Sequence, residues 1–220
     1  MRIHPLFISC LVVASTFLSS PGKAVAGDTE VVERWLSSNG GVGSIMIEFS
    51  QSRSLRSLAA LSGQKGTIWI NYNNGNFRWE TGEPAATIVV GGGSEILIVR
   101  PGQKKYERRK SGSSNSPGIA ALADGLPQSM SQFQAKYKLL GVRKDGETYF
   151  IDTEPKGSAS KEISKFTFVI HSGNYRLVGI ELDMQDGSSM HTVFTKVELD
   201  AATPGSLFRP DLSGYQETKF

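Results

Sequence analysis

Cysteine and histidine are almost absent from this chain, which has one cysteine and three histidines among 220 residues. The single cysteine, Cys10, lies in an N-terminal segment typical of a secretory signal. We therefore expect the mature chain to have no disulfide, no thiol nucleophile and no thiolate metal ligand. His171 and His191 are the only histidines beyond that segment, and zinc requires more nitrogen or sulfur ligands at coordinated spacing.

Motifs of catalysis and of nucleotide binding are also missing. The chain contains no G-x-S-x-G elbow, no P-loop and no H-E-x-x-H. The triple glycine at 91–93 is typical of a hairpin turn, with no helix after it to hold a phosphate. Glu181, Asp183 and Asp186 are typical of a polar strand edge and its turn. We therefore predict that the protein is not an enzyme and needs no cofactor or metal.

The N-terminal segment combines Arg2 and His4 with an apolar run over 6–18 and an A-x-A site that ends at Ala26. This pattern predicts a cleaved signal peptide over 1–26 and a single exported domain over 27–220. An uncleaved membrane anchor is the alternative, but the run is shorter than the roughly 20 apolar residues that span a bilayer. Acylation of Cys10 is disfavoured because too few residues precede it for a charged region and an apolar core.

Charge gives little reason to expect a nucleic-acid partner. Removing Arg2 and Lys23 from the 24 basic residues leaves them nearly balanced against 21 acidic ones. The basic residues are nevertheless concentrated over 100–110, where Glu107 is the only acid. We interpret five of them as a docking patch for an acidic membrane component or anionic headgroups, although a solvated strand end is the alternative: Lys104, Lys105, Arg108, Arg109 and Lys110.

Hydrophobic periodicity predicts a mainly β protein. Val31, Val32, Trp35 and Leu36 form one stripe of a short N-terminal helix. Alternation begins at Ser44, and a hairpin follows around an Asn/Gly turn at 73–76. The segment 51–62 is typical of an irregular or edge strand. Further strands are expected at 86–90, 95–100, 104–109, 138–143, 148–155, 163–171, 175–184 and 190–199, short helices at 119–122 and 128–137, and an irregular arm from 201 onward.

About ten or eleven strands joined by short turns predict an antiparallel sheet that is strongly curved or closed into a barrel. Three segments, 88–90, 96–99 and 166–170, are largely apolar on both faces. Both faces must therefore be shielded there, and an economical solution is a curved sheet whose apolar concave side is closed by the few helices. A filled barrel core is the alternative, because periodicity does not distinguish filled from hollow.

Several stretches lie in order along the chain and together form a longer pattern. The opening strand S-I-M-I-E-F-S-Q is followed by G-T-I-W-I-N, a turn, and F-R-W-E-T-G-E-P-A-A-T-I-V-V-G-G-G. The later F-T-F-V-I-H-S-G-N-Y-R-L-V-G-I-E-L-D-M-Q-D-G-S-S and G-S-L-F-R-P also correspond. Together they cover nearly the whole chain after the signal, and they resemble the LolA family of periplasmic carriers of outer-membrane lipoproteins.

This resemblance implies a half-open β-barrel with a short α-helical lid, LolA/LolB-like, and an apolar cavity for acyl chains. Phe77 and Trp79 match the family's aromatic pair at the cavity. Weaker ligand-binding candidates are Phe49, Ile88, Val90 and Ile98, and core packing is the alternative for all six. The lid would be the weakly helical segment 117–137.

The implied role is that of a chaperone for lipoprotein transport, most simply a monomer. Acylated lipoprotein cargo would come from an inner-membrane ABC transporter (LolCDE-like) and pass to an outer-membrane acceptor (LolB-like), without nucleic acid. One departure concerns an arginine that well-studied members place before the hairpin turn to bind the lid, where this chain has Asn71 and Tyr72. Alternatives are a carrier of another acylated lipid or glycolipid, a periplasmic sensor or interaction module that binds no lipid, and a filled-core structural protein.

Overall fold

The computed structural model describes residues 26–55, 58–110 and 126–218. The predicted signal peptide, except Ala26, and the predicted helix at 119–122 lie outside these ranges. The helices are α1 (Ala26–Ser38) and α3 (Met130–Lys136), with 3-10 turns η1 (Pro101–Gln103), η2 (Gly157–Lys161) and η3 (Gly205–Phe208). The strands are β1 (Ser44–Leu55), β2 (Leu58–Asn71), β3 (Asn76–Thr81), β4 (Thr87–Gly92), β5 (Glu95–Arg100), β6 (Lys105–Lys110), β7 (Tyr137–Asp145), β8 (Thr148–Pro155), β9 (Ile163–His171), β10 (Leu177–Met184), β11 (Ser189–Leu199) and β12 (Gln216–Glu217).

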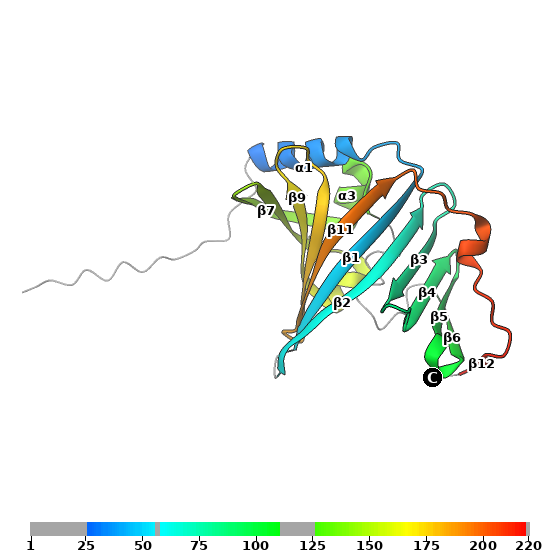
Figure 1. The fold of residues 1–220 in the computed structure, drawn as a ribbon. Helices are drawn as coiled ribbons and strands as arrows, with labels where there is room; N and C mark the ends of the chain where they lie inside the picture. Colours follow the sequence, from blue (N-terminus) through cyan, green and yellow to red (C-terminus); the bar gives the residue numbers. More distant parts are fainter. Residues whose placement is uncertain (1–25, 56–57, 111–125, 219–220) are drawn as a thin grey trace, which may run out of the picture.

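All described strands belong to one sheet in the order β12-β6-β5-β4-β3-β2-β1-β11-β10-β9-β8-β7. Every pairing among them is antiparallel except β12 with β6. The sheet curls strongly, and α1 and α3 lie at the same end of it (Figure 1). This confirms the predicted mainly β, half-open architecture with a helical cover. The closed-barrel alternative is wrong, because β12 and β7, the edges of the described sheet, do not pair with each other.

The segment 51–62 is irregular, as the sequence predicts, but it is not an edge strand, which corrects the other part of that prediction. It lies in the middle of the sheet, where β1 continues to Leu55 and β2 begins at Leu58. Here β1 pairs with β11 on one side and β2 on the other, and its register to β2 shifts at Gln51/Arg53 and again at Arg53/Leu55. These irregularities interrupt the alternation of side chains, which explains why the sequence pattern is mixed there.

An aromatic cluster joins the two helices to the sheet. On α1, Trp35 is 2% exposed, and its ring lies 4.6 Å from that of Phe168 in β9 and 6.2 Å from that of Phe133 in α3. Ser129 caps α3 because its hydroxyl accepts a hydrogen bond from the backbone N–H of Gln132 at 3.2 Å. Phe133 is the buried side chain of α3, whereas Tyr137 already belongs to β7.

The C-terminal arm shields part of the outer face of the sheet. Its η3 turn lies against β3, where the Arg78 guanidinium donates to the carbonyl of Leu207 at 2.9 Å. The arm then runs along the sheet to β12 (Figure 1), which pairs in parallel with β6. The sequence prediction of an irregular arm missed β12 because a two-residue strand carries no periodicity.

We expect Phe168→Ala to lower the free energy of unfolding by about 3–5 kcal/mol, because Phe168 is fully buried and its removal leaves a cavity within the aromatic cluster. Urea unfolding monitored by circular dichroism measures the change. Val193→Thr is the matched control, since Val193 is 60% exposed on β11 and threonine keeps the β-branch. A similar loss in both variants would contradict the placement of Phe168 at the centre of the core.

Candidate functional site

Strand register places one apolar row across the face of the sheet that the helices cover. Residues opposite each other on neighbouring strands point to the same face. Through such pairs Trp79 on β3 connects to Ile68 on β2 and to Val89 on β4, and Val89 connects to Ile98 on β5. On β1, Ile47 pairs with Ile68 and lines a cavity beneath α1, so the whole row belongs to the concave, helix-covered face.

Four of the six predicted ligand-binding residues share this face. Phe49, Phe77, Trp79 and Ile98 are between 2% and 8% exposed. The rings of Phe49 and Trp79 meet edge to face, with centroids 5.5 Å apart and planes at 79°. The aromatic side chains fold over glycines: a Cβ atom at Gly91 would collide with the ring of Phe77. The structure therefore brings the predicted aromatic residues together on one surface.

Ile88 and Val90 lie on the other face, which corrects the expectation that all six residues line one cavity. They alternate with Val89 along β4, and side chains in a strand alternate between faces. Val90 lines an outer groove with Leu97 and with Phe208 of the C-terminal arm. β4 and β5 can thus be apolar on both faces, since the inner face is enclosed and the C-terminal arm covers part of the outer face.

A small cavity lies between α1, the start of the lid segment and the sheet. It measures about 30 Å³ and is lined by Trp35, Tyr72, Leu126, Gln128 and Phe194, among others. This volume holds about one water molecule, so the concave side is closed at this end. Burial raises the pKa of Tyr72 to about 12, so its phenol stays neutral at physiological pH.

Several hydrogen bonds tie the described part of the predicted lid, 126–137, to its neighbours. The side-chain amide of Gln128 donates to the carbonyl of Val42 at 3.0 Å, and its backbone N–H donates to the side chain of Gln132 at 2.9 Å. The Lys156 ammonium donates to the carbonyl of Gln134 at 2.6 Å. Phe133 is the one buried side chain of α3. These hydrogen bonds, together with the buried side chains of Leu126, Phe133 and Tyr137, hold the described part of the lid in place.

Asn71 and Tyr72 occupy the place where the resemblance leads one to expect a lid-binding arginine. The Asn71 side chain donates to the Thr203 hydroxyl at 2.9 Å and accepts from the backbone N–H of Asn73 at 3.0 Å. Asn71 thus fixes the β2–β3 turn to the C-terminal segment. Tyr72 contributes to the cavity beneath the lid, together with Gln128.

The five residues of the predicted docking patch are divided between two faces of the sheet. Lys105 and Arg109 lie opposite inner-face residues of β5, whereas Arg108 lies opposite the outer-face Leu97. Arg108 is 3.8 Å from Glu95 and 3.7 Å from Glu217, so part of its charge is neutralised. Lys104 occupies the left-handed turn before β6, and Lys110 ends that strand. Docking through this patch stays a prediction.

Sequence reasoning missed a buried carboxylate on β6. Glu107 is 3% exposed and lies opposite Ile98, at the end of the apolar row that starts at Ile47. One of its oxygens pairs with the Arg109 guanidinium, and the other is 3.8 Å from that of Arg100. Two features of the sequence could have revealed it. Glu107 is the one acid in a basic strand, and it lies two residues before Arg109, so that both side chains point to the same face.

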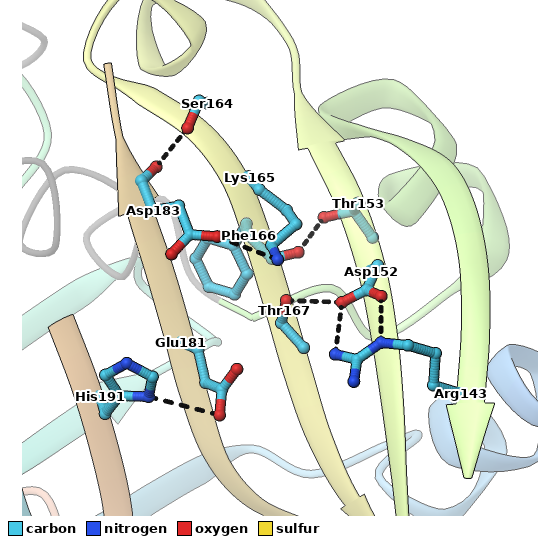
Figure 2. Close-up of polar contacts among 10 residues, drawn as sticks. All are labelled: Arg143, Asp152, Thr153, Ser164, Lys165, Phe166, Thr167, Glu181, Asp183 and His191. Atoms are coloured by element: carbon cyan, nitrogen blue, oxygen red, sulfur yellow. Dashed lines mark hydrogen bonds and ion pairs between the residues drawn. The ribbon is translucent and has the colours of Figure 1, made fainter. Parts of the chain in front are cut away.

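The acids and histidines of the other half of the sheet form polar contacts (Figure 2). Asp152 accepts from Arg143 at 2.7 and 3.1 Å and from Thr167 at 2.8 Å. His191 lies 3.4 Å from Glu181. Among the residues that the structure describes, no three His, Cys, Asp or Glu side chains are grouped to hold a metal ion. Over the same residues, no helix has the length and apolar character to cross a membrane.

Partial burial raises the pKa of Asp152, but hydrogen bonds from Arg143 and Thr167, with the positive charge of Arg143, outweigh it and lower the pKa below its usual range. The ionised carboxylate is thus preferred in the folded state, and its partners explain why. The pair of Asp152 with Arg143 is a structural contact between β8 and β7.

These features define a class of protein: an open antiparallel half-barrel with an enclosed apolar concave face and a light helical cover. The family model "Outer membrane lipoprotein carrier protein LolA" matches residues 40–211, and the chain belongs to this family. The predicted resemblance is thereby confirmed. The family is described as one of lipoprotein carrier proteins.

Individual relatives are distant. An outer-membrane lipoprotein carrier protein of Chromobacterium violaceum is 28% identical over 136 residues, which are 61% of this chain and 62% of that protein. The crystal structure of an uncharacterized conserved protein from Thermus thermophilus is similar with a TM-score of 0.52 and 10% identity, covering 87% of this chain and 98% of that one. A LolA-superfamily protein from Nitrosomonas europaea gives 0.49 at 11% identity, covering 83% and 97%.

We expect Gln128→Ala to accelerate amide hydrogen exchange in α3 by about 2- to 10-fold, because it removes the hydrogen bond that ties the lid segment to Val42. Mass-spectrometric exchange of peptides covering 130–136 measures this. Gln134→Ala is the control, since that side chain is exposed and the variant leaves the Gln128 contact in place. Equal acceleration in both variants would show that Gln128 does not hold the lid.

We expect Asp152→Asn to destabilise the fold in a pH-dependent manner. The folded-state pKa is lowered, so the carboxylate contributes stability above its unfolded-state pKa of about 4, and this is lost as the pH falls through the folded-state pKa. Urea unfolding at a series of pH values should show a gap between wild type and variant that is widest near neutral pH and closes in acid. A gap independent of pH would contradict the role of the ionised carboxylate.

Proposed function

We propose that this protein is a periplasmic carrier that binds the acyl chains of lipoproteins on its concave face and shuttles them from the inner to the outer membrane. The observation that supports this most directly is the buried aromatic surface of Phe49, Phe77 and Trp79 on the concave face, whose far end α1 and α3 cover. Membership in the LolA family supports the same interpretation.

The physical need for such a carrier follows from the hydrophobic effect. Each methylene exposed to water costs about 0.8 kcal/mol, so a diacylated protein does not cross an aqueous compartment unaided. A carrier has to bury these chains and also release them. An apolar face that is fully shielded when empty and reached by displacing a small cover meets both requirements.

Loading requires the cover to move, because the cavity at the helical end holds only about one water molecule in the closed form. The seven residues of α3 bury only Phe133, so local opening there costs far less than unfolding the sheet. Acyl chains would replace the side chains of the cover on the concave face, which keeps that face shielded from water in the loaded state.

In this proposal the cargo travels from a transporter in the inner membrane to an acceptor in the outer membrane. Residues 1–26 would direct export and be removed, leaving 27–220 as one carrier domain. A LolCDE-like ABC transporter would deliver the lipoprotein and a LolB-like acceptor would receive it. The cations of β6 and its preceding turn would dock on acidic partners or headgroups: Lys104, Lys105, Arg108, Arg109 and Lys110. Another acylated lipid or glycolipid would use the same face.

Native mass spectrometry of the protein purified from the periplasm tests this proposal and identifies the cargo. We expect wild type to carry acylated species and Trp79→Glu to lose them, because a carboxylate on the concave face opposes acyl chains. Val193→Glu, on the exposed side of the sheet, should keep them. Circular dichroism establishes that both variants fold. Wild-type protein that is free of ligand and takes up no fluorescent fatty acyl probe would overturn the carrier proposal and favour an interaction module.

A further inference from the structure

Two buried polar side-chain atoms in the described ranges have no hydrogen-bond partner, and both lie on the concave face. They are Nε1 of Trp79 and Oε2 of Glu107. Trp79 is 4% exposed and Glu107 is 3% exposed. Buried polar groups are nearly always paired in folded proteins, since an unpaired one loses its hydrogen bonds to water without replacement. An indole donor and a carboxylate acceptor left open on one surface therefore call for an explanation.

The two atoms belong to side chains in the same row of the sheet. Trp79 pairs with Val89, Val89 with Ile98, and Ile98 with Glu107. Three strand spacings separate the backbones of Trp79 and Glu107, which is about 14 Å. The two residues between them, Val89 and Ile98, are apolar and buried. The row is thus an apolar strip with a free donor at one end and a free acceptor at the other.

The surroundings of Glu107 favour a polar ligand group over a simple ion pair. Its Oε1 pairs with the Arg109 guanidinium, but Oε2 is 3.8 Å from that of Arg100, beyond hydrogen-bonding distance. Arg100 and Arg109 retain 33% and 22% of their side-chain exposure. The buried carboxylate thereby lies between two partly accessible cations, while one of its oxygens is left to accept from another donor.

We propose that this row is a headgroup subsite for acyl esters or amides that carry a hydroxyl or N–H group. The Trp79 indole N–H donates to the carbonyl oxygen of the ester or amide, and Glu107 Oε2 accepts from the hydroxyl or N–H of the same headgroup. The intervening chain lies over Val89 and Ile98. This subsite rests on the proposed acyl-carrier function and adds selectivity for a polar acyl linkage over bare hydrocarbon.

Matched ligands and matched variants test the subsite. A fluorescent fatty acyl probe is first bound to delipidated protein. Monopalmitoyl glycerol, methyl palmitate or hexadecane is then added, and the affinity of each is measured from the displacement of the probe. The first offers carbonyl and hydroxyls, the second a carbonyl alone, and the third neither. Trp79→Phe removes the N–H but keeps an aromatic ring. Its control is Trp69→Phe on β2, because Trp69 pairs with Arg78 and faces away from the Trp79 row. Glu107→Gln is matched by Glu95→Gln, whose side chain is exposed.

We expect Trp79→Phe to lower the affinity for monopalmitoyl glycerol and for methyl palmitate by about 3- to 10-fold. The affinity for hexadecane should not change. Glu107→Gln should lower the affinity for monopalmitoyl glycerol by a similar factor and leave the affinities for methyl palmitate and hexadecane unchanged. Both control variants should match wild type, and circular dichroism shows that each variant folds.

Uniform weakening of all three ligands, or equal effects of the control variants, would overturn the subsite while leaving the carrier proposal intact. Wild-type protein that binds none of the ligands would overturn both. The two failures are therefore distinguishable from the wild-type titrations alone.

Discussion

The fold depends on the pairing of β1 with β11, which joins residues about 150 positions apart in the chain. This ladder converts two meanders, β2 to β6 and β7 to β11, into one sheet. Hydrogen bonds fix its register at one end: the Ser44 hydroxyl donates to the carbonyl of Ala201 at 2.6 Å, and the Gly43 N–H donates to the Asp200 carboxylate at 2.9 Å. A one-residue slip would turn Ile47, which is fully buried, towards solvent.

The two faces of this sheet differ in polarity and in what covers them. The inner face is apolar from β1 to β5 and ends at Glu107, and the helices cover one end of it through Trp35 and Phe133. The outer face is polar over β8–β11. There Asp152 pairs with Arg143, and Glu181 lies beside His191 on the neighbouring strand. Over β4 and β5 it is apolar again, and there the C-terminal arm lies against it. Each apolar surface therefore has a separate cover.

The difference between these covers matters for a carrier. The C-terminal arm is tied to the sheet by backbone hydrogen bonds, from Gln216 to Lys104 at 2.9 Å and from Thr218 to Tyr106 at 2.8 Å. The lid segment is held by buried Phe133 in α3, by the side chain of Gln128 and by a backbone hydrogen bond from Lys156 to Lys136 at 2.8 Å. A sheet that stays rigid while its inner cover moves can exchange ligand without unfolding.

The sequence by itself determined most strand positions, because alternating side chains and Gly/Asn turns are local signals. It also determined the helical stripe with Trp35, a short helix close to α3 and, through ordered motifs, the family. It did not determine which face Ile88 and Val90 occupy, since a strand that is apolar on both sides gives no direction. Nor did it reveal that Glu107 shares a row with Trp79, that 51–62 lies mid-sheet, or that the basic residues divide between faces. These were decided by the tertiary structure alone, because strand register is set by pairing between segments distant in sequence, and no local pattern records it.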